Sequence, residues 1–198
     1  NEYGNRIVKI SDFTYTKNQI TNGEYLNFVA SGAYINDKYW SEEGLLWRKF
    51  RNTKRPTFWV ATGPEGTHQY ELRVLFENIP LPLSWPAEVN FHEAEAYCKF
   101  KMEVDQTNLK YRLLTEAEFT ALTPKGIDSV LQKNSYSTIK GLSEIEKEYK
   151  ENFNFTWSSA KNVDSQLYGN TWHWLVDQFN PLEGFEINSL YDDFSTPC

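Results

Sequence analysis

The sequence predicts a loop-rich α+β domain, and its aromatic content is the main reason. The 198 residues include 7 Trp, 12 Tyr and 13 Phe but only one Met. Aromatic side chains bury large areas and carry N–H and O–H groups that need partners, which suits a core built from irregular segments. Helical and strand-like patterns are short and are separated by Pro- and Gly-containing stretches. The length allows one well-buried core, or at most two small ones. We therefore expect an α+β domain rather than a helical bundle.

The first half of the chain is expected to contain a strand, two helices and a pair of strands. Residues 6–20 alternate loosely between apolar and polar, which predicts an edge or half-buried strand. Thr21 or Asn22 can cap a short helix that ends at Gly32. Residues 55–60 and 70–76 predict strands on either side of a turn at 63–66. A second helix opens at Ser41, and its predicted buried side consists of Leu45, Leu46, Trp47 and Phe50.

The second half contains the clearest helix. Pro80, Pro82 and Pro86 exclude a helix interior before it. Asn90 can cap the helix, and Glu93 can complete a capping box. Most of the stripe that follows at helical spacing is expected to be core: Phe91, Ala94, Tyr97, Cys98 and Lys101.

After a brief strand expected over 111–114, Thr115 and Glu118 predict a second capping box and a short helix that stops before Pro124. Residues 124–152 are polar and are expected to form a surface insertion with one exposed helix from Ser143. Order is expected to return over 153–157.

Charge and cysteine usage exclude several classes of partner. The formal charge of −7 argues against nucleic acid or an anionic membrane, because both attract clustered Lys and Arg. No apolar run approaches the length of a membrane span, and no signal peptide is recognised. Two cysteines do not make a disulfide framework, so a reducing, cytoplasmic compartment is expected. The one local exception to the negative charge is a basic run, expected to be a solvated face: Arg48, Lys49, Arg51, Lys54 and Arg55.

No metal site is predicted from the residues of this chain. The three histidines, His68, His92 and His173, lie too far apart to share a helical face. The patterns H-E-x-x-H, H-x-x-x-H and C-x-x-C are absent. His92 reads as a polar residue in the first turn of a helix rather than a ligand. There is no G-x-S-x-G motif and no glycine-rich phosphate-binding loop. A nucleophilic catalytic triad stays an alternative, without a motif to support it.

Several longer motifs recur in a fixed order. They are T-N-G-E-Y at Thr21, A-E-A-Y-C at Ala94, R-L-L-T-E-A-E at Arg112 and G-N-T-W-H-W at Gly169. This order resembles the formylglycine-generating (sulfatase-modifying factor) superfamily, which implies a C-type-lectin-like fold. The downstream G-G-S-W segment usual in that superfamily is absent, so residues 1–198 are expected to be a partial domain, truncated at the C-terminus.

Within the superfamily, one branch is especially similar. Y-W-S-E-E-G at Tyr39, R-P-T-F-W-V at Arg55, H-Q-Y-E-L-R at His68 and L-Y-D-D-F-S-T-P-C at Leu190 resemble the central domain of the 5-histidylcysteine sulfoxide synthases of ovothiol biosynthesis. The resemblance implies a non-haem Fe(II) enzyme that uses O₂ to join cysteine sulfur to the imidazole carbon of histidine. In that branch, histidines of a separate N-terminal helical domain hold the iron. That domain is therefore an implied partner, with cysteine and histidine as substrates.

The resemblance also assigns candidate site residues. Tyr191 stands at the position of the branch's active-site tyrosine, where a phenol can donate a hydrogen bond or a proton. The alternative is a tyrosine whose ring merely packs. Trp172 could join the same wall, and for the tryptophans core packing is the favoured alternative. The other residues implied to line the substrate pocket are Asp192, Asp193, Phe194, Trp174 and Asp177, with a turn position as the alternative for one of the two adjacent aspartates.

Departures and rival functions remain. Many superfamily members carry an acidic residue between the two tryptophans, where calcium can bind; here the position is His173, so no calcium site is expected. One rival is a sulfoxide synthase of the ergothioneine type, which uses a different thiol and a methylated histidine. The other is a non-catalytic binding module with a lectin-like fold.

Overall fold

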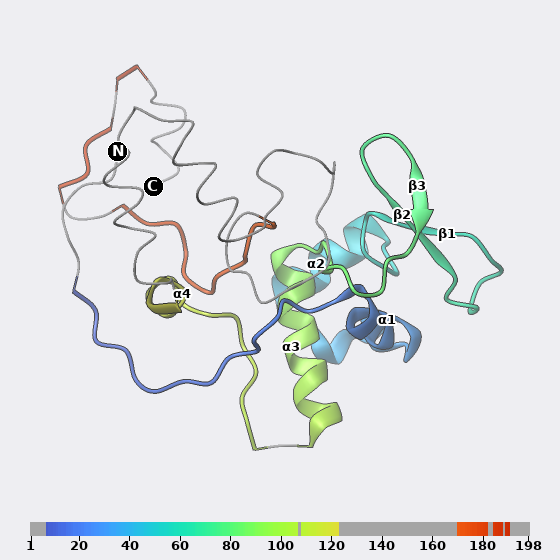
Figure 1. Cartoon of the computed structure of the whole chain (residues 1–198), viewed down its shortest axis with the longest axis horizontal. Coiled ribbons are helices and arrows are strands. Elements are labelled where there is room, and N and C mark those ends of the chain that lie inside the picture. The colour runs from blue at the N-terminus through green and yellow to red at the C-terminus, as the bar shows by residue number, and fades with distance from the viewer. Residues whose placement is uncertain (1–6, 107, 123–169, 182–183, 188, 191–198) are drawn as a thin grey trace, which may run out of the picture.

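The described residues form several helices and one small antiparallel sheet, which lies at one side of the helices (Figure 1). The computed structural model describes residues 7–106, 108–122, 170–181, 184–187 and 189–190 (Figure 1). This mixture of helices and antiparallel strands confirms the predicted α+β class, and no described helix has the length and apolar character needed to cross a membrane. In chain order, the elements are α1 (Asn22–Ala30), η1 (Ala33–Ile35), η2 (Asp37–Tyr39), α2 (Glu42–Arg51), β1 (Trp59–Ala61), β2 (Tyr70–Arg73), β3 (Asn78–Pro80), α3 (Phe91–Asp105) and α4 (Glu116–Leu122).

The capping residues predicted from the sequence begin the helices as expected. Thr21 caps α1 and forms a complete capping box with Glu24. Asn90 and Glu93 form the same arrangement at the start of α3. At α4, the Glu118 backbone N–H donates to Thr115 Oγ1 at 3.2 Å, and the Thr115 N–H donates to Glu118 Oε2 at 2.9 Å. Each box satisfies backbone donors that the first helical turn leaves free.

The sheet has the order β1-β2-β3 with both pairs antiparallel. Trp59 pairs with Leu72 and Leu72 pairs with Ile79, so one face presents these side chains to the core. The second strand ends at Arg73, earlier than predicted, because the Val74 N–H donates to Glu77 O and the chain reverses there. Strand β3 was not predicted, and it ends at Pro80, which suits an edge strand.

Two predicted strands are wrong. Residues 7–20 contain no strand, and their side chains are exposed or at most half-buried. An isolated bridge between Thr21 and Pro86 is the nearest ladder contact. Residues 111–114 also lack strand structure, and Leu114 O instead accepts a hydrogen bond from the Val176 N–H at 2.9 Å. A strand forms only beside another strand that supplies hydrogen-bonding partners. The alternation of apolar and polar residues does not reveal whether such a neighbour exists.

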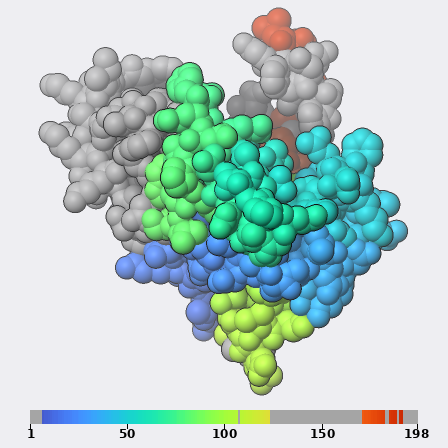
Figure 2. All heavy atoms as spheres, turned by 90° about the vertical axis from the view of Figure 1, so that its right-hand side faces the viewer, coloured from blue at the N-terminus to red at the C-terminus, as the bar shows by residue number. Residues whose placement is uncertain are grey.

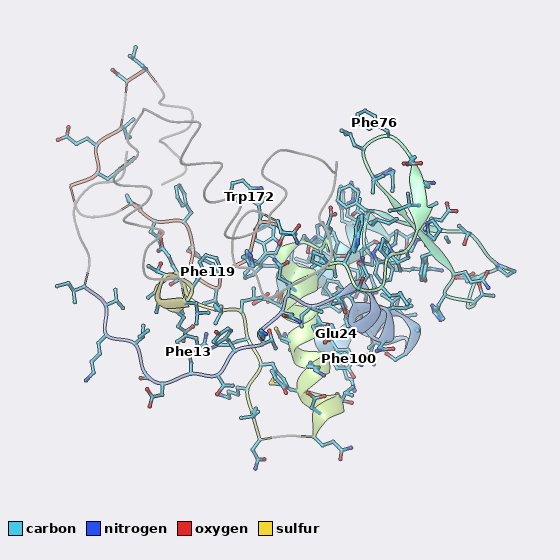
Figure 3. The ribbon with its side chains drawn as sticks, in the orientation of Figure 1. Phe13, Glu24, Phe76, Phe100, Phe119 and Trp172 are labelled. Carbon is cyan, nitrogen blue, oxygen red and sulfur yellow. The ribbon has the colours of Figure 1, made fainter. Side chains whose placement is uncertain are left out.

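The core is a cluster of aromatic rings between α1, η1, α3 and the sheet. Phe28 is fully buried, and its ring centroid lies 5.1 Å from that of Phe100 on α3. Tyr25 stacks on Tyr97 at 5.3 Å and meets Trp59 edge to face at 6.1 Å. Figure 3 shows Phe100 pointing from α3 toward α1. The aromatic composition therefore forms the core, as the sequence suggested.

The predicted buried side of α2 is partly wrong. Leu46 is 65% exposed and Phe50 is 87% exposed, whereas Leu45 and Trp47 are half-buried. The buried residues of this helix are Gly44 and Arg48. Gly44 lies against α3, where a Cβ atom would come within 3.1 Å of His92 Cβ. The absence of a side chain thus allows close approach, and this contact, rather than the apolar stripe, fixes which face is buried.

Several predictions fall outside the described residues. They concern the insertion at 124–152 with its helix from Ser143, the ordered segment at 153–157, and the candidate site residues Tyr191, Asp192, Asp193 and Phe194.

Candidate functional site

The side of α3 that faces away from the aromatic core borders a cavity of about 940 Å³, called here the α3 cavity. Ala94, Cys98 and Lys101 line it from one face of the helix. They were predicted to be core together with Phe91 and Tyr97, but the most buried residues of α3 are Glu93, Ala96, Tyr97 and Phe100. The sequence held a signal for this only at position 101, because a lysine is almost never fully buried unless it is paired. Residues from the other walls of the α3 cavity include Gln19, Phe58, Tyr111, Leu113, Phe119 and 170–175.

Three hydrogen bonds hold the segment 170–177 across this cavity, one to Val89 and two to residues 114–116. The Trp174 indole N–H donates to Val89 O at 2.9 Å. The Val176 N–H donates to Leu114 O at 2.9 Å. The Asp177 carboxylate accepts from the Glu116 N–H at 2.6 Å, at the first residue of α4. Residues 170–174 of the G-N-T-W-H-W motif and the A-E-A-Y-C motif of α3 thereby line the same cavity.

His173 is held in the cavity wall by residues that the sequence did not single out. Gln19 Nε2 lies 3.0 Å from His173 Nε2 and also contacts Thr171 Oγ1. An amide nitrogen only donates, so a hydrogen bond between these two atoms makes His173 Nε2 the acceptor. The Phe119 ring of α4 lies 5.1 Å from the imidazole. Figure 3 shows Phe119 and Trp172 on the other side of α3 from Phe100. Gln19 belongs to the segment predicted as a strand, so no local signal marked it.

The two cations in the described lining of the α3 cavity, Lys101 and Arg112, are each paired with a carboxylate outside that lining. Arg112 forms two hydrogen bonds with the Glu118 carboxylate, at 2.7 and 2.8 Å. The Arg112 guanidinium and the Thr115 N–H hold the pKa of Glu118 well below its usual range, at about 2. Lys101 pairs with Asp105 at 3.0 Å. Both cations therefore already have a carboxylate partner.

The Cys98 thiol is protonated at neutral pH. Burial raises its pKa to about 11, and the nearby Glu95 carboxylate adds to this. The thiolate is the nucleophilic and metal-binding form of cysteine. Cys98 therefore serves the cavity wall as a small apolar group.

A buried hydrogen-bonded group fixes the start of α3. The Tyr34 hydroxyl donates to Glu93 Oε1 at 2.6 Å, and the Asn90 N–H donates to Glu93 Oε2 at 2.8 Å. The Tyr25 hydroxyl donates to Glu93 O at 3.2 Å. Burial raises the pKa of Glu93, and the two hydrogen bonds to its carboxylate oppose that rise. These contacts position the helix that carries Ala94 and Cys98.

The structure places the sequence-predicted site residues unevenly. Trp174 lines the α3 cavity and is 52% exposed, and Trp172 lines it and is 101% exposed, so core packing of the two tryptophans is wrong. Asp177 lies outside the cavity lining, at the N-terminus of α4. Tyr191 and its three neighbours through Phe194 lie outside the described residues.

The described residues contain no group of three His, Cys, Asp or Glu side chains that could hold a metal ion. His173 and Cys98 both line the α3 cavity, but the imidazole Nε2 is engaged by Gln19 and the thiol is protonated. The described part of the chain thus does not fit an iron site. Aromatic rings with amide, hydroxyl and imidazole groups between them suit a small molecule with an aromatic or cationic part.

Comparison with known proteins agrees with the motif order. A family model described as the sulfatase-modifying factor enzyme 1-like domain matches residues 1–193. A hercynine oxygenase of Mycobacterium tuberculosis is 24% identical over 211 residues, covering 100% of this chain and 45% of the relative. A hercynine oxygenase of Mycolicibacterium smegmatis is 25% identical over 199 residues, covering 100% of this chain and 44% of the relative. The chain spans less than half the length of these curated relatives. It belongs to the sulfatase-modifying factor enzyme 1-like domain family.

Proposed function

We propose that this chain is one domain of an Fe(II)- and O₂-dependent sulfoxide synthase that couples the sulfur of cysteine to the imidazole carbon of histidine, giving 5-histidylcysteine sulfoxide. Its domain has the C-type-lectin-like fold of the family. In the net reaction, a thiol, an imidazole C–H and O₂ become a sulfoxide and water, so that both hydrogens leave on one oxygen atom. Oxygen is the oxidant for the four electrons removed.

One observation carries the proposal. Described residues of three family motifs line one cavity: 94, 97 and 98 of A-E-A-Y-C, 112–114 of R-L-L-T and 170–174 of G-N-T-W-H-W. Such convergence on a concave, mainly apolar site is typical of a small-molecule binding site. The chain residues would bind and orient the two amino acids there and exclude bulk water. The two cysteines in 198 residues support a reducing, cytoplasmic setting.

The iron that the resemblance implies requires ligands beyond the described residues, since these contain no metal-binding cluster. We propose that histidines of an N-terminal helical domain supply them. The relatives leave room for such a domain, because the chain covers 44% and 45% of their lengths. Tyr191 is proposed to donate a hydrogen bond or a proton at the reacting centre, and Asp192, Asp193 and Phe194 to contact substrate. Trp174 would offer its exposed ring to the cavity.

The test uses the full-length protein with iron, O₂, cysteine and histidine, and detects the coupled sulfoxide by mass spectrometry. Tyr191→Phe is expected to lower coupling while cysteine oxidation persists or rises. Tyr15→Phe is the matched control, because Tyr15 is 48% exposed and lies outside the cavity lining. An unchanged product ratio in Tyr191→Phe would remove that residue from the mechanism.

A second candidate is a synthase of the ergothioneine type. It is favoured by relatives that are named hercynine oxygenase, and by the aromatic cavity wall, which suits a methylated ammonium group. Competition between histidine and its trimethylated form at equal concentration decides between the two candidates. No product with either substrate would favour the non-catalytic binding module.

A further inference from the structure

A second cavity, of about 810 Å³, lies between the C-terminus of α2 and the β1–β2 hairpin, and is called here the hairpin cavity. Phe58 lines the α3 cavity, Trp59 lines the hairpin cavity, and Thr57 lines both. Figure 2 shows the face of the molecule that carries the sheet and α2, with the hairpin in teal and the preceding helical region in lighter blue beside it. The hairpin cavity is lined by residues of R-P-T-F-W-V and G-P-E-G-T-H-Q-Y, and of these two motifs only Thr57 and Phe58 line the α3 cavity.

The basic run of the sequence divides between two environments. Arg48 and Lys49 both pair with Asp37, outside the hairpin cavity. Arg51, Lys54 and Arg55 line the cavity, whereas Glu65 is the one carboxylate among its described lining residues. Glu65 pairs with Lys54 at 2.5 Å. The described lining therefore carries an excess of positive charge, in a chain whose formal charge is −7. The whole run is thus not simply a solvated face.

Arg55 is held in a fixed orientation at this site. Its Nε–H donates to Trp59 O at 2.9 Å, and its guanidinium carbon lies 5.9 Å from the centre of the Tyr70 ring. These contacts engage one edge of the guanidinium, and the terminal nitrogens have no bond to another described residue. A planar guanidinium fixed in this way binds a carboxylate or phosphate with little further ordering.

Two further features point to a ligand. Trp59 is 2% exposed, and its indole N–H has no acceptor among the described residues. A buried donor without an acceptor is costly, and a bound oxygen atom would remove that cost. His68 has φ 51°, in the left-handed region that a non-glycine residue rarely adopts, with Nδ1 3.3 Å from the Tyr70 hydroxyl. Backbone strain of this kind clusters at ligand-binding sites.

We propose that the hairpin cavity binds a small oxyanion, a carboxylate or phosphate group. The Arg55 guanidinium and the Trp59 indole N–H are its hydrogen-bond donors, and Arg51 and Lys54 supply charge. This site is separate from the α3 cavity, and it stands whether or not the proposed catalytic function holds. Its occupant would brace the segment 55–59, which also forms part of the α3 cavity wall through Thr57 and Phe58.

The test is isothermal titration of the full-length protein with inorganic phosphate and, separately, with malonate, at constant ionic strength. Tighter binding of one probe tells a phosphate ligand from a carboxylate ligand. Arg55→Lys keeps the charge but loses the planar fork, and it is expected to weaken binding by about tenfold, the effect of one charge-assisted hydrogen bond. Arg51→Gln at an exposed position should weaken binding by a few-fold. Arg73→Gln is the matched control, since it removes the same charge from the same sheet outside the cavity.

A second readout does not depend on any variant at the site remaining well folded. In ¹⁵N-indole spectra of the unaltered protein, the Trp59 N–H resonance, assigned by its loss in Trp59→Phe, should move on addition of the probe that binds. The site is supported if either probe binds, if Arg55→Lys and Arg51→Gln weaken that binding, and if Arg73→Gln leaves it unchanged. The proposal is overturned if neither probe binds, if Arg73→Gln weakens binding as much as Arg51→Gln, or if the Trp59 resonance stays fixed at saturation.

Discussion

Replacing Tyr34 with phenylalanine removes one oxygen atom from the interior of the domain and leaves the shape of the ring unchanged. The lost hydroxyl donates to Glu93 Oε1 at 2.6 Å, joining η1 to α3 across 59 residues of sequence. Tyr34 is 0% exposed and Glu93 is 2% exposed, so water cannot replace the missing donor. The carboxylate keeps its bond from the Asn90 N–H at 2.8 Å, but Oε1 is left without this partner.

The size of the effect follows from these contacts. A hydrogen bond to a charged group contributes about 1.5–3 kcal/mol, and no cavity forms because the ring stays. We therefore expect Tyr34→Phe to lower the free energy of unfolding by about 2 kcal/mol at pH 7. For a chain of this length, that corresponds to a fall in Tm of about 4–8 °C.

The dependence on pH gives a second signature. The folded-state pKa of Glu93 is raised, chiefly by burial, so the folded state holds this proton more tightly than the unfolded chain. Its contribution to stability is therefore fully present below the unfolded pKa of about 4.3 and declines as pH rises through the folded value. Loss of the Tyr34 donor raises the pKa of Glu93 further. The deficit of the variant should accordingly shrink from about 2 kcal/mol at pH 7 to about 1 kcal/mol at pH 4, where the bond joins two neutral groups.

Urea unfolding followed by tryptophan fluorescence measures both quantities. Tyr97→Phe is the matched control, because Tyr97 stacks in the same cluster and its hydroxyl forms no hydrogen bond to the other described residues. Destabilisation by Tyr34→Phe of less than about 0.5 kcal/mol, or equal to that of the control, would refute the reasoning.

Three further outcomes are expected. Glu118→Gln should lower the free energy of unfolding by about 1 kcal/mol at pH 7, a value discounted because Arg112 is half exposed. The folded-state pKa of Glu118 is lowered to about 2, so this stability is present above the unfolded-state pKa and is lost as pH falls toward 2. The stability of the variant should therefore fall less steeply with acid than that of the unaltered protein. Gly44→Ala should cost about 1–2 kcal/mol by overpacking against His92, whereas Leu46→Ala on the same helix should change urea stability by less than about 0.5 kcal/mol. The Cys98 thiol, with its pKa raised to about 11, should react with iodoacetamide at pH 8 roughly a hundredfold more slowly than in the urea-unfolded chain, as followed by peptide mass spectrometry.

The local signals in the sequence were reliable where a few neighbouring residues decide the outcome. Thr21 with Glu24, Asn90 with Glu93 and Thr115 with Glu118 each form hydrogen bonds within four residues, so the helix starts could be predicted from spacing. The aromatic composition likewise indicated how the core is made. The order of motifs pointed to the correct family without any structural information.

Predictions that depended on distant partners were less successful. Residues 7–20 alternate as a strand would, yet the described structure gives them no neighbouring strand. On α2, the apolar stripe at Leu46 and Phe50 suggested one buried face, but the close contact allowed by Gly44 turned the opposite face inward. Burial of a helix face depends on what lies against it, which spacing along that helix does not contain.

The sequence by itself determined the helix starts, the aromatic core and the family, because these follow from residue type and short-range spacing. Only the tertiary structure decided which side of α3 faces a cavity, since that depends on the hydrogen bonds from Trp174, Val176 and Asp177 that bring segment 170–177 across it. It likewise showed that the backbone carbonyl of Trp59 holds Arg55, whereas Asp37 pairs with Arg48. The basic residues are alike in the sequence, but their partners differ because the fold places different groups beside each of them.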